Sequence, residues 1–119
     1  MKFEGTGLDQ LHAELSRLDH AMEQNGMVRA GQWDYERVTY DKKMEHRGEI
    51  YYLRVQGYAT DGEIDSRHAV IKLMTPLLGK HYYPHGVEYG ESEDFPEAIV
   101  NSCKNALKRL KEEIEAITI

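Results

Sequence analysis

The chain has 119 residues, of which 40% are hydrophobic and 30% charged, and only three are prolines. This length and composition exclude a disordered or low-complexity segment and predict a single domain, residues 1–119, with its own core. Acidic residues outnumber basic ones by 21 to 15, which gives a formal net charge of −6 and argues against nucleic acid as a partner. No stretch approaches the ~20 apolar residues of a membrane helix, and the first residues lack the apolar segment of a signal peptide, so we expect no membrane association.

The single cysteine, Cys103, cannot form an internal disulfide. A free thiol fits a reducing compartment better than an exported protein, so the expected location is the cytoplasm.

The first predicted elements are a short strand at residues 1–5 and a helix over residues 8–25. Apolar residues recur along the helix at spacings of three and four, which places them on one stripe: Leu8, Leu11, Leu15, Leu18 and Met22. Thr6 is a suitable N-cap, and Asn25-Gly26 supplies the residues that commonly end helices.

Residues 27–91 show no helical period and are rich in residues that favour strands. Arg47-Gly48 and Asp61-Gly62 are predicted hairpin turns between antiparallel strands. Residues 51–56 alternate between apolar and mixed side chains, whereas the apolar phase slips over residues 33–40, and a bulge near Arg37 would reconcile the two halves. The seven basic and eight acidic residues between positions 33 and 75 are well mixed and are interpreted as solvated surface.

The stretch HYYPHGVEYG, residues 81–90, is predicted to form a turn between two strands. Pro84 opens the turn and Gly86 closes it, which leaves His85 at an exposed tip. His81, His85 and Glu88 have the chemistry of metal ligands, but two histidines four residues apart form a compact site only on a helix. They are therefore only weak metal candidates, and we expect no cofactor.

The last predicted helix begins near Asp94, an N-cap candidate with Glu97 three residues later, and Pro96 lies in its first turn. Its apolar stripe comprises Ile99, Cys103, Ala106, Leu107, Leu110, Ile114 and Ile117, so the Cys103 thiol should be buried and inert. The element order is β-α-β-β-β-β-α, and the predicted class is α+β, a curved antiparallel sheet with both helices packed on one face.

All eight tyrosines and the only tryptophan fall between residues 33 and 89. They are either amphipathic rings on a half-exposed sheet face or a binding surface, formed as a cavity between the sheet and the long helix or as a self-association face. The candidate ligand or interface contacts are Trp33, Tyr35, Tyr40, Tyr83, His85 and Tyr89.

The usual catalytic motifs are missing: no G-x-S-x-G, no phosphate-binding glycine-rich loop, no H-E-x-x-H and no C-x-x-C. No catalytic residue is assigned, and the leading hypothesis is a non-enzymatic ligand-binding or protein-interaction domain whose partner is a small molecule, a protein or a second copy in a homodimer. The alternative is a small metal-assisted hydrolase or isomerase that uses His81, His85 and Glu88. A third hypothesis is a regulator that docks on a basic partner through its acidic helix.

Two stretches, LDHAMEQNGMVRAGQWDYERVTYD and VIKLMTPLLGKHYYPHGVEYGESEDFP, resemble the YugN-like proteins of Bacillus and related bacteria over nearly the whole chain. The resemblance implies a small cytoplasmic bacterial protein with an α+β fold like that of the TATA-binding protein. It brings no catalytic or metal residues to carry over, and a shared fold does not imply DNA binding.

Overall fold

The structure is a computed structural model and describes residues 1–31, 36–64, 68–90 and 94–119. It contains an antiparallel sheet and two helices, so the predicted α+β class is confirmed. In the described ranges, a short 3₁₀ helix η1 opens the fold and is followed by seven strands and the two α-helices. In chain order they are η1 (Leu8–Gln10), β1 (His12–Glu14), α1 (Leu15–Gln24), β2 (Val28–Arg29), β3 (Arg37–His46), β4 (Glu49–Asp61), β5 (Val70–Leu73), β6 (Leu77–His81), β7 (Val87–Glu88) and α2 (Glu97–Glu115).

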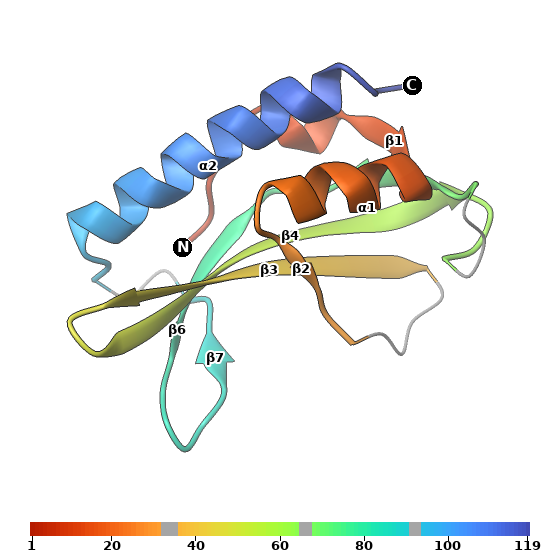
Figure 1. Cartoon of the computed structure of the whole chain (residues 1–119). Helices are drawn as coiled ribbons and strands as arrows, with labels where there is room; N and C mark the ends of the chain where they lie inside the picture. The colour runs from red at the N-terminus through yellow and green to blue at the C-terminus, as the bar shows by residue number, and fades with distance from the viewer. Residues whose placement is uncertain (32–35, 65–67, 91–93) are drawn as a thin grey trace.

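The long strands β3 and β4 form the centre of the sheet (Figure 1). They pair without interruption over the whole of β3, and a two-residue turn joins them. Both turn residues have positive φ, 50° at Arg47 and 80° at Gly48, as in the hairpin turns whose twist matches that of the strands. The predicted turn at Arg47-Gly48 is confirmed.

The other edge of β4 is shared by two strands, β6 at residues 51–54 and β5 at residues 57–61. Strand β1 pairs with the outer edge of β5, and β7 pairs with β6. The strand predicted at residues 1–5 is reduced to one isolated bridge between Lys2 and Leu77. Nearby, the amino group of Met1 donates hydrogen bonds to the carbonyl oxygens of Leu78 and Tyr89, each at 2.9 Å. The described residues therefore form more strands than the five predicted, and the predicted first strand is not among them.

Both helices lie on one side of the sheet, which leaves the other side open (Figure 1). The predicted alternation in β4 is confirmed: Tyr51, Leu53 and Val55 are buried, and the residues between them are half-exposed. The core lies on the covered side and receives side chains from η1, both helices and strands β3 to β6. Its largest fully buried side chains are Tyr40, Leu8, Leu18, Met22, Leu53, Ile71, Leu73, Leu78, Leu110, Ile114, Val38 and Val55.

The first predicted helix is wrong in its first half, because α1 begins only at Leu15. Residues 8–10 form η1, and residues 12–14 form an edge strand on β5, with Ala13 opposite Ile71. Thr6 caps no helix, because the N-cap of η1 is Gly7; the Thr6 hydroxyl accepts a hydrogen bond from the Leu8 amide at 3.2 Å. Pairing with the edge of β5 has overridden the helical spacing of the leucines.

The end of α1 follows the prediction. The Gly26 amide donates to the Glu23 carbonyl at 3.1 Å and the Met27 amide to the Met22 carbonyl at 3.0 Å. Gly26 has φ 73°, so this is a Schellman motif with glycine in the left-handed position.

The last helix also agrees with its predicted stripe, because Ile99, Cys103, Ala106, Leu107, Leu110 and Ile114 are all buried. Its predicted start was wrong, since the N-cap is Pro96 and not Asp94. The Pro96 carbonyl accepts hydrogen bonds from the amides of Ile99 and Val100, each at 3.0 Å. Pro96 can occupy the cap because a cap residue needs no amide of its own.

One further prediction fails in the sheet. Asp61-Gly62 ends β4, but β5 starts only at Val70, so this is not a two-residue hairpin. The pairing of β3 with β4 is unbroken from Arg37 onward. The pairing of β4 with β5 is irregular, with a register shift in β4 between Ala59 and Asp61. The described bulge thus lies at the far end of β4; the bulge predicted near Arg37 depends on residues 33–35, which lie outside the described part of the chain, so it stays a prediction.

Neither helix in the described part of the chain is long and apolar enough to cross a membrane. Cys103 is buried, as predicted. Burial raises the pKa of its thiol to about 12, with a small opposing effect from Lys42.

Candidate functional site

The open side of the sheet, which we call the open face, concentrates basic side chains at its centre. Four residues of β4 point to this face, Tyr52, Arg54, Gln56 and Tyr58, and the strand register fixes their neighbours. Among the described residues, these four rows hold five basic side chains and one acidic one: Lys2, Arg37, Lys43, Arg54, Lys72 and Asp41. These six side chains have a formal net charge of +4, whereas the whole chain has a formal net charge of −6. Glu45 and Asp61 lie outside these rows, toward the two ends of the sheet.

Arg54 is the centre of the open face. Its Nε donates to Oδ1 of Asp41 at 2.8 Å, and its Nη2 donates to Oδ2 at 2.9 Å. The two side chains are 30% and 18% exposed. The hydrogen bond with Asp41 raises the pKa of Arg54, and a bidentate pair of this kind holds the guanidinium plane in one orientation.

Tyr89 stacks beneath that guanidinium, whose central carbon lies 4.9 Å from the ring centroid. The ring in turn covers Gly79, where a Cβ atom would come within 2.6 Å of two ring carbons. The Tyr89 hydroxyl is buried and has no hydrogen-bond partner of good geometry among the described residues. Burial is the main reason that the pKa of Tyr89 is raised to about 12, and Arg54 opposes this shift.

The remaining side chains of the open face are amphipathic and half-exposed. Tyr52 meets His81 edge to face, with ring centroids 6.4 Å apart. The Gln56 amide donates to the Thr39 hydroxyl at 3.1 Å, and Tyr58 is 39% exposed. Tyrosine and arginine around a fixed charged pair are typical of interface centres.

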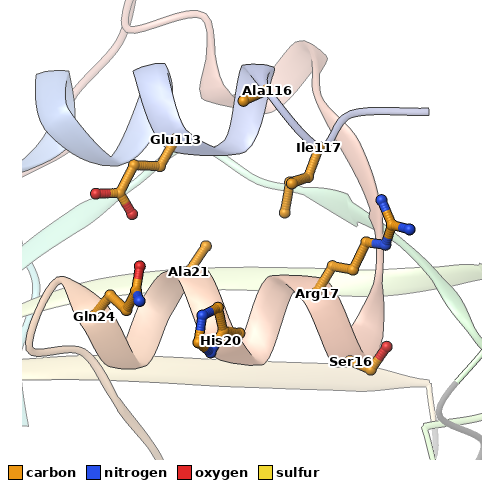
Figure 2. Close-up of a pocket in the computed structure, with 8 residues that line it drawn as sticks. All are labelled: Ser16, Arg17, His20, Ala21, Gln24, Glu113, Ala116 and Ile117. Atoms are coloured by element: carbon orange, nitrogen blue, oxygen red, sulfur yellow. The ribbon is translucent and has the colours of Figure 1, made fainter.

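A groove of about 640 Å³ runs between α1 and the end of α2 (Figure 2). Figure 2 shows Ala21 of α1 pointing toward α2 and Ile117 pointing back toward α1, while Ala116 borders the groove at the end of α2. The rim is polar and carries Ser16, Arg17, His20, Gln24 and Glu113. At one end, the Asn25 amide donates to Glu113 at 2.6 Å and so ties the two helices together.

Two smaller hollows of about 430 and 400 Å³ lie along α1 next to Arg29 of β2, and Asp19 and Glu23 of α1 line both. The Tyr40 hydroxyl donates to Asp19 at 2.5 Å, and Arg29 donates to the other carboxylate oxygen at 3.1 Å. Burial, and then the bond to Asp19, raise the pKa of Tyr40. This network links β3, β2 and α1, and each carboxylate oxygen of Asp19 accepts a hydrogen bond.

The predicted contact residues do not form one surface. Tyr40 lies in the core on the covered side, whereas Tyr89 lies on the open face. Tyr83, which is 91% exposed, and the exposed His85 occupy the tip of the hairpin between β6 and β7, which projects from the body in Figure 1. Trp33 and Tyr35 lie outside the described residues.

The weak metal candidates are also separated. His81 belongs to the open face, whereas Glu88 pairs with Lys80 and points to the other side of the sheet. Within the described ranges, no three histidine, cysteine or acidic side chains are placed to hold a metal ion.

The residues that sequence reasoning missed are the basic ones of the open face and the pair Arg17 and His20 in the groove. Lys43, Arg54 and Lys72 occur in a stretch where charges of both signs are mixed. Strand alternation combined with the register of the predicted hairpin could have placed these basic residues on one face, because side chains two residues apart in a strand point to the same side of the sheet.

Comparison with known proteins gives a consistent set of relatives. A model of the YugN-like family matches residues 5–112. The uncharacterised protein YlbA of Bacillus subtilis is 53% identical over 117 residues, 98% of each chain. The uncharacterised protein YugN of the same organism is 28% identical over 74 residues, 62% of this chain and 55% of that protein. The crystal structure of YugN from Geobacillus kaustophilus superposes with a TM-score of 0.87 at 58% identity, covering 98% of this chain and 97% of that one.

Proposed function

The chain belongs to the YugN-like family, and from that premise we propose that it is a non-enzymatic protein-interaction domain whose open face binds an acidic segment of a partner protein. One observation carries the proposal: the centre of the open face has a net charge of +4 while the chain as a whole has −6. The rest of the molecule therefore has a formal charge of −10. Such segregation steers an acidic segment to one side of the sheet.

A protein segment fits this face better than a nucleic acid. Proteins that bind single strands stack bases on several exposed aromatic faces. Of the open-face tyrosines, Tyr89 lies between Arg54 and Gly79 and Tyr52 meets His81 edge to face, which leaves Tyr58. A long polyanion would also be repelled by the acidic remainder of the chain, whereas a short segment meets only the basic rows. The likeness to the TATA-binding-protein fold stays a prediction, and a fold alone does not bring DNA binding.

Pairing of two open faces in a homodimer would bring like charges together. Arg54 already has its carboxylate within the same chain, so a second copy offers Lys43 and Lys72 no acidic neighbour from the central rows. Self-association through other residues, the hairpin tip among them, stays a prediction.

The proposal is tested with a fluorescent octaglutamate peptide, whose binding is followed by anisotropy at 20 and 200 mM salt. We expect salt-sensitive binding that is lost in Lys43→Glu/Lys72→Glu. The matched control is Lys104→Glu/Lys108→Glu, which reverses two exposed charges on α2 and should bind as the wild type does.

Other outcomes would overturn the proposal. Equal loss in the two double variants would show that only net charge matters. Tighter binding of an oligothymidine of eight nucleotides would assign the face to nucleic acid. A dimer in sedimentation at 20 mM salt that Lys43→Glu/Lys72→Glu dissociates would make the open face a self-association surface.

A further inference from the structure

We propose that the groove between α1 and α2 is a second, independent site that binds a small amphipathic carboxylate, with its apolar tail between the helices and its head at Arg17 and His20. The groove lies on the covered side of the sheet and shares no residue with the open face. Its volume of about 640 Å³ falls in the range of small-molecule sites.

The groove exists because small residues meet at this part of the helix pair. Elsewhere, large buried side chains fill the space beneath the helices, including Leu18 of α1 and Leu110 and Ile114 of α2. Where the groove lies, Ala21 of α1 points toward α2, Ile117 reaches in from beyond the end of α2, and the exposed Ala116 borders the groove (Figure 2). These three residues make an apolar floor that the helices themselves do not fill, and an apolar tail would cover it.

The rim supplies the charge for an anionic head. Arg17 and His20 are three residues apart on α1 and so lie on the same side of the helix. Neither makes a hydrogen bond or ion pair with the described residues; Arg17 contributes only weakly to lowering the pKa of Glu14, after the hydrogen bond from Ser16 and the influence of His68. By contrast, Glu113 already accepts a hydrogen bond from Asn25. The donors without partners therefore favour a carboxylate, which arginine binds in a bidentate manner.

The chain's own C-terminal residues do not occupy the groove. The Ile119 amide and the Thr118 hydroxyl both donate to the His12 carbonyl, at 3.0 and 2.9 Å. Residues 118 and 119 are thus held against β1 and lie outside the groove.

The test is calorimetric titration of the full chain with decanoate and, separately, with decyltrimethylammonium, which has the same tail and the opposite charge. We expect decanoate to bind and the cationic amphiphile to bind at least several-fold more weakly. Arg17→Gln should weaken decanoate binding roughly tenfold, the effect of losing one charge-assisted hydrogen bond. Ala116→Leu, which fills the floor and leaves both donors in place, should weaken binding of both amphiphiles.

Matched controls separate the groove from the general surface. Arg109→Gln removes an exposed arginine of α2, and Ala98→Leu adds the same bulk in its first turn; both should bind decanoate like the wild type. Equal binding of the two amphiphiles would overturn the carboxylate assignment. No binding of decanoate, or binding unchanged by both Arg17→Gln and Ala116→Leu, would overturn the site. None of these results bears on binding of the octaglutamate peptide, so the proposals for the groove and for the open face are tested independently.

Discussion

Substituting Gly79 by alanine should displace Tyr89 from the open face. Gly79 is buried, and an added Cβ would lie 2.6 Å from two ring carbons of Tyr89 and 2.7 Å from a methyl carbon of Val87. Real Cβ atoms do not approach so closely, so the ring and strand β7 must move. The stack with Arg54 depends on the ring position, and the movement should therefore open the centre of the open face.

The magnitude follows from two opposing effects. Overpacking of a fitted site costs about 1–3 kcal/mol, whereas replacing glycine by alanine in a strand gains roughly 0.5–1 kcal/mol. We expect Gly79→Ala to lower the free energy of unfolding by about 1–2 kcal/mol, which for a chain of this size corresponds to roughly 4–8 °C in Tm.

Urea denaturation followed by tyrosine fluorescence measures this change. Gly86→Ala is the matched control, because it lies in the same hairpin with no atom within 4 Å of the added Cβ. In the Tyr89→Ala background, Gly79→Ala should cost less stability than in the wild type, because only the 2.7 Å contact with the Val87 methyl carbon then remains. If Gly79→Ala proves as stable as Gly86→Ala, the ring does not pack on Gly79 and the structure assigned to the open face is incorrect.

Tyr40→Phe removes the hydrogen bond donated to Asp19 and should lower the free energy of unfolding by about 1–2 kcal/mol in urea denaturation; an unchanged midpoint would contradict this. The Cys103 pKa of about 12 predicts roughly 1000-fold less thiolate near pH 8 than at an exposed cysteine, so Ellman's reagent should label it only after unfolding. Because burial raises the pKa of the Cys103 thiol, the buried neutral thiol contributes its full stability below about pH 9, and this contribution is lost as the pH rises toward about 12. The free energy of unfolding of Cys103→Ala should therefore fall less than that of the wild type between pH 9 and 11. Gly26→Ala forces a side chain into φ 73° and should cost about 1 kcal/mol, whereas Gly31→Ala, which has neither positive φ nor close neighbours, should be neutral in the same assay.

Local signals predicted those parts of the fold in which local chemistry and tertiary packing agree. Gly26 ends α1 and Gly48 turns the central hairpin because each occupies a left-handed conformation that favours glycine. The stripe of α2 was readable because one face of a long helix must be apolar to cover a sheet. The residues before α1 were misread because Leu8 and Leu11 satisfy a helical spacing while the edge of β5 requires a strand partner. No local pattern reports that requirement.

The open face was hidden for a different reason. Along the chain, Lys42 and Lys43 are equivalent neighbours, but in the sheet Lys42 pairs with the buried Leu53 and Lys43 with the half-exposed Tyr52. A sheet sorts alternate residues to opposite sides, so a sequence in which charges are mixed can still form a surface of one sign. The register that sorts them is set by the turn at Arg47-Gly48, and an error of one residue there would reverse the result.

The same sorting makes the two proposed sites separable within one molecule. Asp41 and Tyr40 are neighbours on β3, yet Asp41 binds Arg54 on the open face and Tyr40 binds Asp19 beneath α1. Lys43→Glu/Lys72→Glu should therefore abolish peptide binding and leave the decanoate affinity unchanged, and Arg17→Gln should do the reverse. If saturating decanoate alters the affinity for the peptide, the peptide must alter the affinity for decanoate by the same factor.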